Sequence, residues 1–157
     1  CDKDTARELE ERYRTGQYAK RPGEDIESIV KGVSGFKGQV HVAFGTPLDI
    51  DDEARPNDVA SAADAQILGL MRFHPVNYAA AQKLASRNTI NALPLSLQEE
   101  MPEKEALSDA HSQLDQRPGA INSALHPWLL GIYANALLRR HTVPVGELRN
   151  PEEQLQS

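Results

Sequence analysis

Residues 38–45 read GQVHVAFG, and this stretch decides which fold class the chain can adopt. Val40, Val42 and Phe44 alternate with smaller or more polar residues, which is the period of a β-strand, and a glycine stands at each end. Backbone groups of a strand need partners, and a stable sheet needs about three strands. No second stretch of similar quality occurs among the 157 residues. The sequence therefore predicts a mostly α-helical chain with one strand, residues 39–44, whose partner strands lie outside it.

The composition excludes several classes of function. Apolar residues make up 39% of the chain and aromatic residues only 5%, which predicts a thin core. The net charge is −6, from 23 acidic and 17 basic residues, and this argues against nucleic acid as a main partner. The longest apolar stretch, from Trp128 to Leu138, is interrupted by Gly131 and Asn135 and is too short to cross a membrane.

The single cysteine, Cys1, excludes an internal disulfide and gives no metal cluster. Two interpretations fit a cysteine at this position: the start of a fragment of a longer protein, or the mature end of a lipoprotein that carries lipid on Cys1. We favour the fragment, because the unpaired strand independently predicts that residues are missing.

Helical periodicity and capping residues account for most of the remaining chain. We expect helices over residues 3–15, from Glu24 to Gly35, 57–72 with Asn57 as N-cap, 76–86, 102–116 and 122–140. The second of these carries one apolar face, formed by Ile26, Ile29, Val30 and Val33. Residues 93–97 are predicted to be a linker, and the polar tail 142–157 to be loosely ordered.

Four polar residues are candidates for a site: His41, Arg72, His74 and Asn77. His41 lies on the opposite face of the strand from Val40, and no nucleophile or carboxylate is placed near it, so we favour a structural role. Arg72 and His74 belong to a polar and aromatic cluster that could hold a phosphate or carboxylate. We favour a helix junction there, with Asn77 satisfying backbone groups that Pro75 leaves free.

Other patterns favour ordinary structural roles. The acidic run 49–53 lacks the spacing of a calcium loop, and His111 with Asp115 supplies only two ligands of a metal site. The basic residues of 138–141 complement a helix terminus, with contact to a membrane surface as the alternative. The residues alone predict no catalytic centre.

Several islands of the chain resemble the C-terminal part of bacterial phospholipid/glycerol acyltransferases, relatives of 1-acyl-glycerol-3-phosphate acyltransferase. The islands are Cys1-Asp2, residues 22–25 (PGED) leading into Ile29-Val30, residues 35–45 (GFKGQVHVAFG), residues 74–78 (HPVNY) and residues 133–135 (YAN). The resemblance covers most of the chain and is most specific at the strand.

The catalytic motif of that family, His-x-x-x-x-Asp, is absent. The fifth residue after each of the five histidines is Thr46, Ala79, Gln116, Gly131 and Gly146, and none is aspartate. In the family this motif lies upstream, so no functional residue carries over. The resemblance implies a parent enzyme that moves an acyl group from acyl-CoA or acyl carrier protein to a lysophospholipid or glycerol-phosphate hydroxyl, at the inner face of the bacterial inner membrane.

The resemblance also implies a division of the chain. Residues 1–48 would end an α/β acyltransferase domain, residues 49–141 would form a helical extension, and residues 142–157 a tail. The segment would have no cofactor of its own, and its partner would be the upstream catalytic segment. The alternative is a helical interaction module, including a lipoprotein anchored at Cys1, whose strand pairs with a partner chain.

Overall fold

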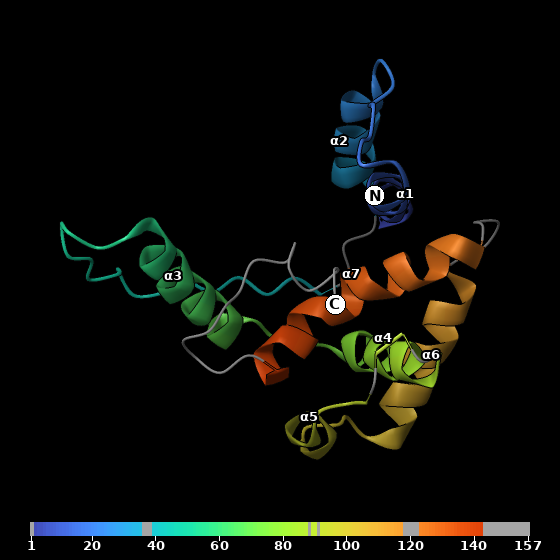
Figure 1. The fold of residues 1–157 in the computed structure, drawn as a ribbon. Helices are drawn as coiled ribbons and strands as arrows, with labels where there is room; N and C mark the ends of the chain where they lie inside the picture. Colours follow the sequence, from blue (N-terminus) through green and yellow to red (C-terminus); the bar gives the residue numbers. More distant parts are fainter. Residues whose placement is uncertain (1, 36–38, 88, 91, 118–122, 143–157) are drawn as a thin grey trace.

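The described residues of the chain, 2–35, 39–87, 89–90, 92–117 and 123–142 in a computed structural model, are helical or irregular and include no strand. The helices are α1 (Asp2–Thr15), α2 (Glu24–Ser34), α3 (Pro56–Leu70), α4 (Pro75–Ser86), α5 (Leu95–Glu99), α6 (Lys104–Gln116), the 3-10 turn η1 (Ser123–Leu125) and α7 (His126–Thr142). The expectation of a mostly helical chain is confirmed (Figure 1).

The core lies where α4, α6 and α7 pack together, with α5 beside α7 (Figure 1). Three consecutive alanines of α4, residues 79–81, are fully buried, and such small side chains let neighbouring helices approach closely. The larger buried side chains around them are Tyr78 and five leucines, and each leucine contributes about 1.5–3 kcal/mol by leaving water. The leucines are Leu84, Leu97, Leu114, Leu130 and Leu137.

Helix α7 is apolar on several sides because it has several neighbours. One side of α7 packs on α4. Another side contacts α1, where the centroids of the Tyr13 and Trp128 rings lie 5.3 Å apart. The helix was expected to begin at residue 122, which lies outside the described residues; the described part begins with η1 at Ser123. Other helices of this chain therefore cover most of the apolar surface of α7.

Several predicted boundaries are wrong, including the end of α3, which lies at Leu70 and not at residue 72, and one helix was missed. Helix α3 begins at Pro56, so Asn57 lies inside its first turn; the N-cap is Arg55, whose extended backbone suits the residue before a proline. Residues 95–99 form helix α5 where a linker was predicted, because Leu97 is fully buried against the core. Helix α6 begins at Lys104, two residues after Pro102.

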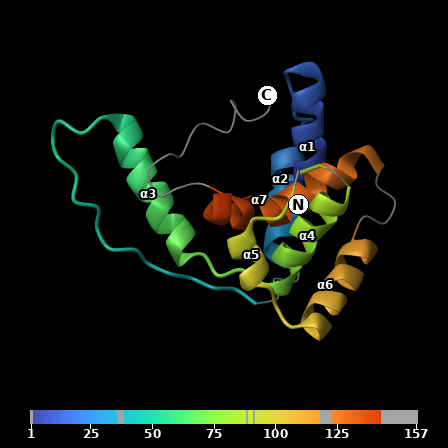
Figure 2. The same ribbon diagram turned by 60° about the horizontal axis from the view of Figure 1, so that its bottom comes forward.

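The predicted strand Gln39–Phe44 does not form in the described part of the chain. Its residues are irregular in backbone structure, and Val40, Val42 and Phe44 are 71%, 70% and 91% exposed. A ladder needs a second extended segment alongside, and the described residues supply none. The segment and α3 instead form an arm that leaves the core on one side (Figures 1 and 2).

Helix α2 forms as predicted and ends at Gly35, but it buries no residue. Its apolar face, Ile26, Ile29, Val30 and Val33, is between 57% and 78% exposed. The division of the chain at residue 48 stays a prediction. Of the predicted tail, Thr142 is the last residue of α7, and residues 143–157 lie outside the described residues.

Candidate functional site

Three of the four polar candidates line one open groove of about 370 Å³ between the extended segment and the C-terminal end of α3. His41 comes from the extended segment, and Arg72 and His74 come from the junction between α3 and α4. The structure thus brings together residues that are more than thirty positions apart in the sequence.

In the extended segment, His41, Ala43 and Gly45 line the groove and Val40 and Val42 do not, although all five residues are exposed to solvent. Gln66 of α3 pins the end of this segment, because its Nε2 donates to the Thr46 carbonyl at 3.0 Å. A side chain at Gly45 would place its Cβ 1.5 Å from Gln66 Oε1, so this close approach requires glycine or a displaced Gln66.

Asn77 lies outside the groove and holds the helix junction. Its Oδ1 accepts a hydrogen bond from the His74 backbone N–H at 2.8 Å, and its Nδ2 donates to the Tyr133 carbonyl at 2.7 Å. The first bond satisfies a backbone group at the start of α4, as expected next to Pro75, and the second fastens α4 to α7. Asn77 therefore positions His74 at the end of the groove.

The end of the groove is electropositive. No acidic residue lines it, although the whole chain carries a net charge of −6. Close to Met71, the Arg140 guanidinium lies 5.7 Å from the centre of the Phe73 ring. Its Nη1 donates a hydrogen bond to the Met71 carbonyl at 3.4 Å. The arrangement can bind an anion; its described lining includes no serine, threonine, cysteine or lysine.

Two other sequence candidates have ordinary partners. His111 Nε2 lies 2.8 Å from the Gln82 side-chain oxygen, and Asp115 forms an ion pair with Lys83 at 2.7 Å. Partial burial lowers the pKa of His111, which favours its neutral form. In the acidic run, the Asp51 side chain accepts a bond from the Glu53 N–H. The described residues contain no group of three possible metal ligands.

A serine, a histidine and a glutamate meet where α5 approaches the end of α7. The His141 Nδ1 lies 3.0 Å from Ser96 Oγ, and Nε2 lies 3.4 Å from Glu100 Oε2. Ser96 and Glu100 are on the exposed surface of a five-residue helix and its end, outside the groove. We interpret these contacts as a tether between α5 and α7.

A polar network that sequence reasoning missed fastens α1 to the core. The Tyr133 hydroxyl donates to the Asp2 carboxylate, and Arg117 Nη1 lies 3.0 Å from the same carboxylate. Burial, followed by the Asp2 hydrogen bond, raises the pKa of Tyr133. These residues are more than one hundred positions apart or lie on different helices, so no local motif could have identified them.

We expect acid to release α1 from the core. Burial alone would raise the pKa of Asp2, but hydrogen bonds from Tyr133 and Arg117 outweigh it and hold the pKa below 3.8. The stabilisation is therefore fully present above the usual pKa of 3.8 and is lost as the pH falls through the lowered folded pKa. The fluorescence of Trp128, which contacts Tyr13 of α1, should report the release.

The Asp2→Asn variant is the control for this titration. It keeps the side-chain volume and removes the titrating group, so its fluorescence should change little over the same pH range. An identical acid transition in the variant and the natural chain would contradict the assignment to Asp2.

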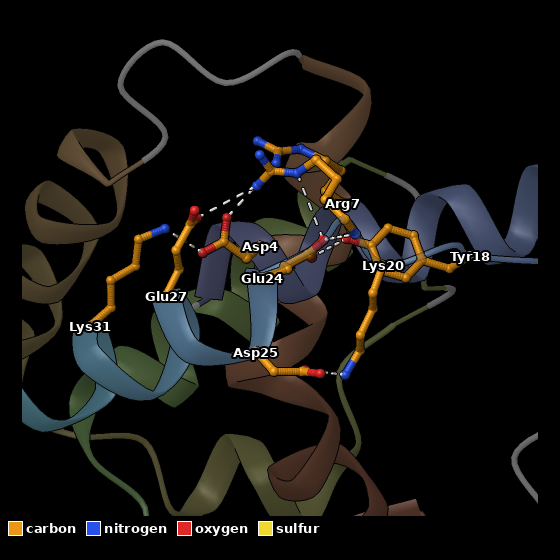
Figure 3. Close-up of polar contacts among 9 residues, drawn as sticks. Asp4, Arg7, Tyr18, Lys20, Glu24, Asp25, Glu27 and Lys31 are labelled. Carbon is orange, nitrogen blue, oxygen red and sulfur yellow. Dashed lines mark hydrogen bonds and ion pairs between the residues drawn. The ribbon is translucent and has the colours of Figure 1, made fainter.

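Ion pairs and a hydrogen bond link α2 to α1 and to the loop between the two helices. Lys31 lies 3.2 Å from Asp4, and Lys20 lies 2.6 Å from Asp25, while the Tyr18 hydroxyl donates to Glu24 (Figure 3). Exposed ion pairs of this kind contribute about 0–1 kcal/mol each. The cluster is therefore a weak attachment of α2, and its charges are matched rather than poised for chemistry.

None of the helices described in the structure is long and apolar enough to cross a membrane. No protein-family profile, curated protein or solved structure matches the chain.

Proposed function

We propose that this chain is the non-catalytic C-terminal segment of an acyltransferase that moves an acyl group from acyl-CoA or acyl carrier protein to a lysophospholipid or glycerol-phosphate hydroxyl. The resemblance of residues 22–45 to that family supports the proposal. The single observation that carries it is a pair of exposed apolar surfaces that no other described residue covers, on α2 and on the segment 39–44.

The two surfaces match what a missing sheet would cover. Burying a valine, isoleucine or phenylalanine stabilises by about 1.5–3 kcal/mol, and seven such side chains are mostly exposed. They are Ile26, Ile29, Val30, Val33, Val40, Val42 and Phe44. Helix followed by strand is half of an α/β unit, and a free extended segment is suited to pairing with a sheet edge.

In this proposal the chain contributes structure and the upstream segment contributes chemistry. Segment 39–44 would add a strand to the catalytic sheet, and α2 would cover one face of it. The helices from α3 to α7 would form an extension beside the catalytic domain, at the inner face of the bacterial inner membrane.

The first test is the coding sequence immediately before Cys1. We expect it to encode a His-x-x-x-x-Asp motif in the same reading frame. A signal sequence that ends at Cys1 would instead support the alternative, a lipoprotein-type interaction module, and clear acyl transfer by the purified 157-residue chain would contradict a non-catalytic role.

The second test uses the encoded upstream segment, co-expressed with this chain. Val42→Asp places a charge on the exposed apolar face and should abolish co-purification and acyl transfer. Leu95→Asp is the matched control, because Leu95 is 78% exposed but lies on α5 in the helical extension. Equal effects of the two variants would contradict docking through segment 39–44.

A further inference from the structure

The groove between segment 41–45 and the end of α3 has two walls of different chemistry. The end of α3 contributes Ile67 and Leu70, which are three residues apart and lie on one face of the helix, and Met71 follows them as the C-cap; the three side chains are 56%, 37% and 41% exposed. The polar end is made by Arg72 and His74, with His41 from the facing segment. An apolar stripe thus leads to a group of hydrogen-bond donors.

The charge of the groove selects for an anion. Carboxylates are absent from its described lining, and the first turn of α4, which follows His74 directly, contains no acidic residue. The Arg140 guanidinium is outside the lining and donates to the Met71 carbonyl at 3.4 Å. In a chain whose net charge is −6, such a local excess of donors is complementary to a negative ligand.

The size of the groove fits a small ligand. Its volume of about 370 Å³ is at the lower end of the 300–1,000 Å³ range of small-molecule sites. A planar guanidinium can donate two parallel hydrogen bonds to a phosphate or carboxylate, whereas the α3 stripe offers contacts only to hydrocarbon.

We propose that this groove binds a phosphate or carboxylate that carries a short aliphatic chain. Arg72 and His74 hold the anionic group, and the chain lies along Ile67, Leu70 and Met71. The site lies between segment 41–45 and the helical extension, and its argument stands without the acyltransferase proposal.

Octyl phosphate, below its micelle concentration, is the probe for the full chain. Isothermal titration should detect binding, and the ring-proton NMR signals of His41 and His74 should shift. Inorganic phosphate and octyl glucoside each supply one half of the probe and should bind at least about tenfold more weakly, since each lacks one set of contacts. Equal binding of either one would overturn the proposal, as would the absence of any binding by octyl phosphate.

Two arginines provide a matched pair of variants. Arg72 precedes the first turn of α4 and Arg87 follows its last turn, and both are exposed, so neither replacement by glutamine should unfold the chain. Arg72→Gln should weaken octyl phosphate binding about tenfold, and Arg87→Gln should change it less than twofold. Equal effects of the two variants would show non-specific charge attraction and overturn the site. Failure of the acyl-transfer tests would leave these results unchanged.

Discussion

Replacing Leu97 by alanine should lower the free energy of unfolding by about 2–5 kcal/mol. Leu97 is fully buried although it lies on a helix of only five residues, and it joins the cluster formed by α4, α6 and α7. The substitution removes apolar contacts and leaves a cavity that the surrounding helices fill only partly. Urea unfolding followed by circular dichroism measures the change.

Leu95→Ala is the control from the same short helix. Leu95 is 78% exposed, so the same substitution two residues away should change the free energy of unfolding by no more than about 0.5 kcal/mol. If the two variants were equally stable, α5 would not be packed on the core through Leu97.

The second large effect is expected at Asn77. Asn77→Ala removes the bonds to the His74 N–H and to the Tyr133 carbonyl, so the free energy of unfolding should fall by about 1–3 kcal/mol. The His74 ring signal should also shift in the NMR spectrum, because the start of α4 loses the contact that fixes it.

Asn57→Ala is a suitable comparison, since Asn57 is exposed in the first turn of α3 and tests asparagine removal at a helix start. We expect a change within about 0.5 kcal/mol. If Asn57→Ala lowered the free energy of unfolding as much as Asn77→Ala, the loss would come from removing an asparagine at a helix start. It would then not be evidence for the bond from Asn77 to the Tyr133 carbonyl.

The helices could be predicted because their signals are local. Gly16 and Gly35 end α1 and α2 where expected, and Pro75 starts α4. The predicted strand failed because a strand depends on partners: residues 39–44 have no neighbouring strand in the described part of the chain. Helix α5 was missed because its stability comes from tertiary burial of Leu97, which overrides a weak local signal.

The site could be predicted only as separate residues. His41 and the pair Arg72 and His74 were each identified as polar, but each was given a structural role because its surroundings were unknown. They come together because α3 lies alongside segment 41–45. The hydrogen bond from Gln66 of α3 to the Thr46 carbonyl holds the two in place. The prediction for Asn77 was better because its bond to His74 spans three residues.

All members of the buried cluster, and the side chains packed against it, lie between residues 73 and 138, while α2 and α3 bury nothing. Helices α2 and α3 are therefore expected to open independently of the core formed by α4, α6 and α7. Amide hydrogens of α2 and α3 will exchange with solvent through local opening, at a rate set by each helix alone. Those of α4 and α7 will exchange only when the core itself opens.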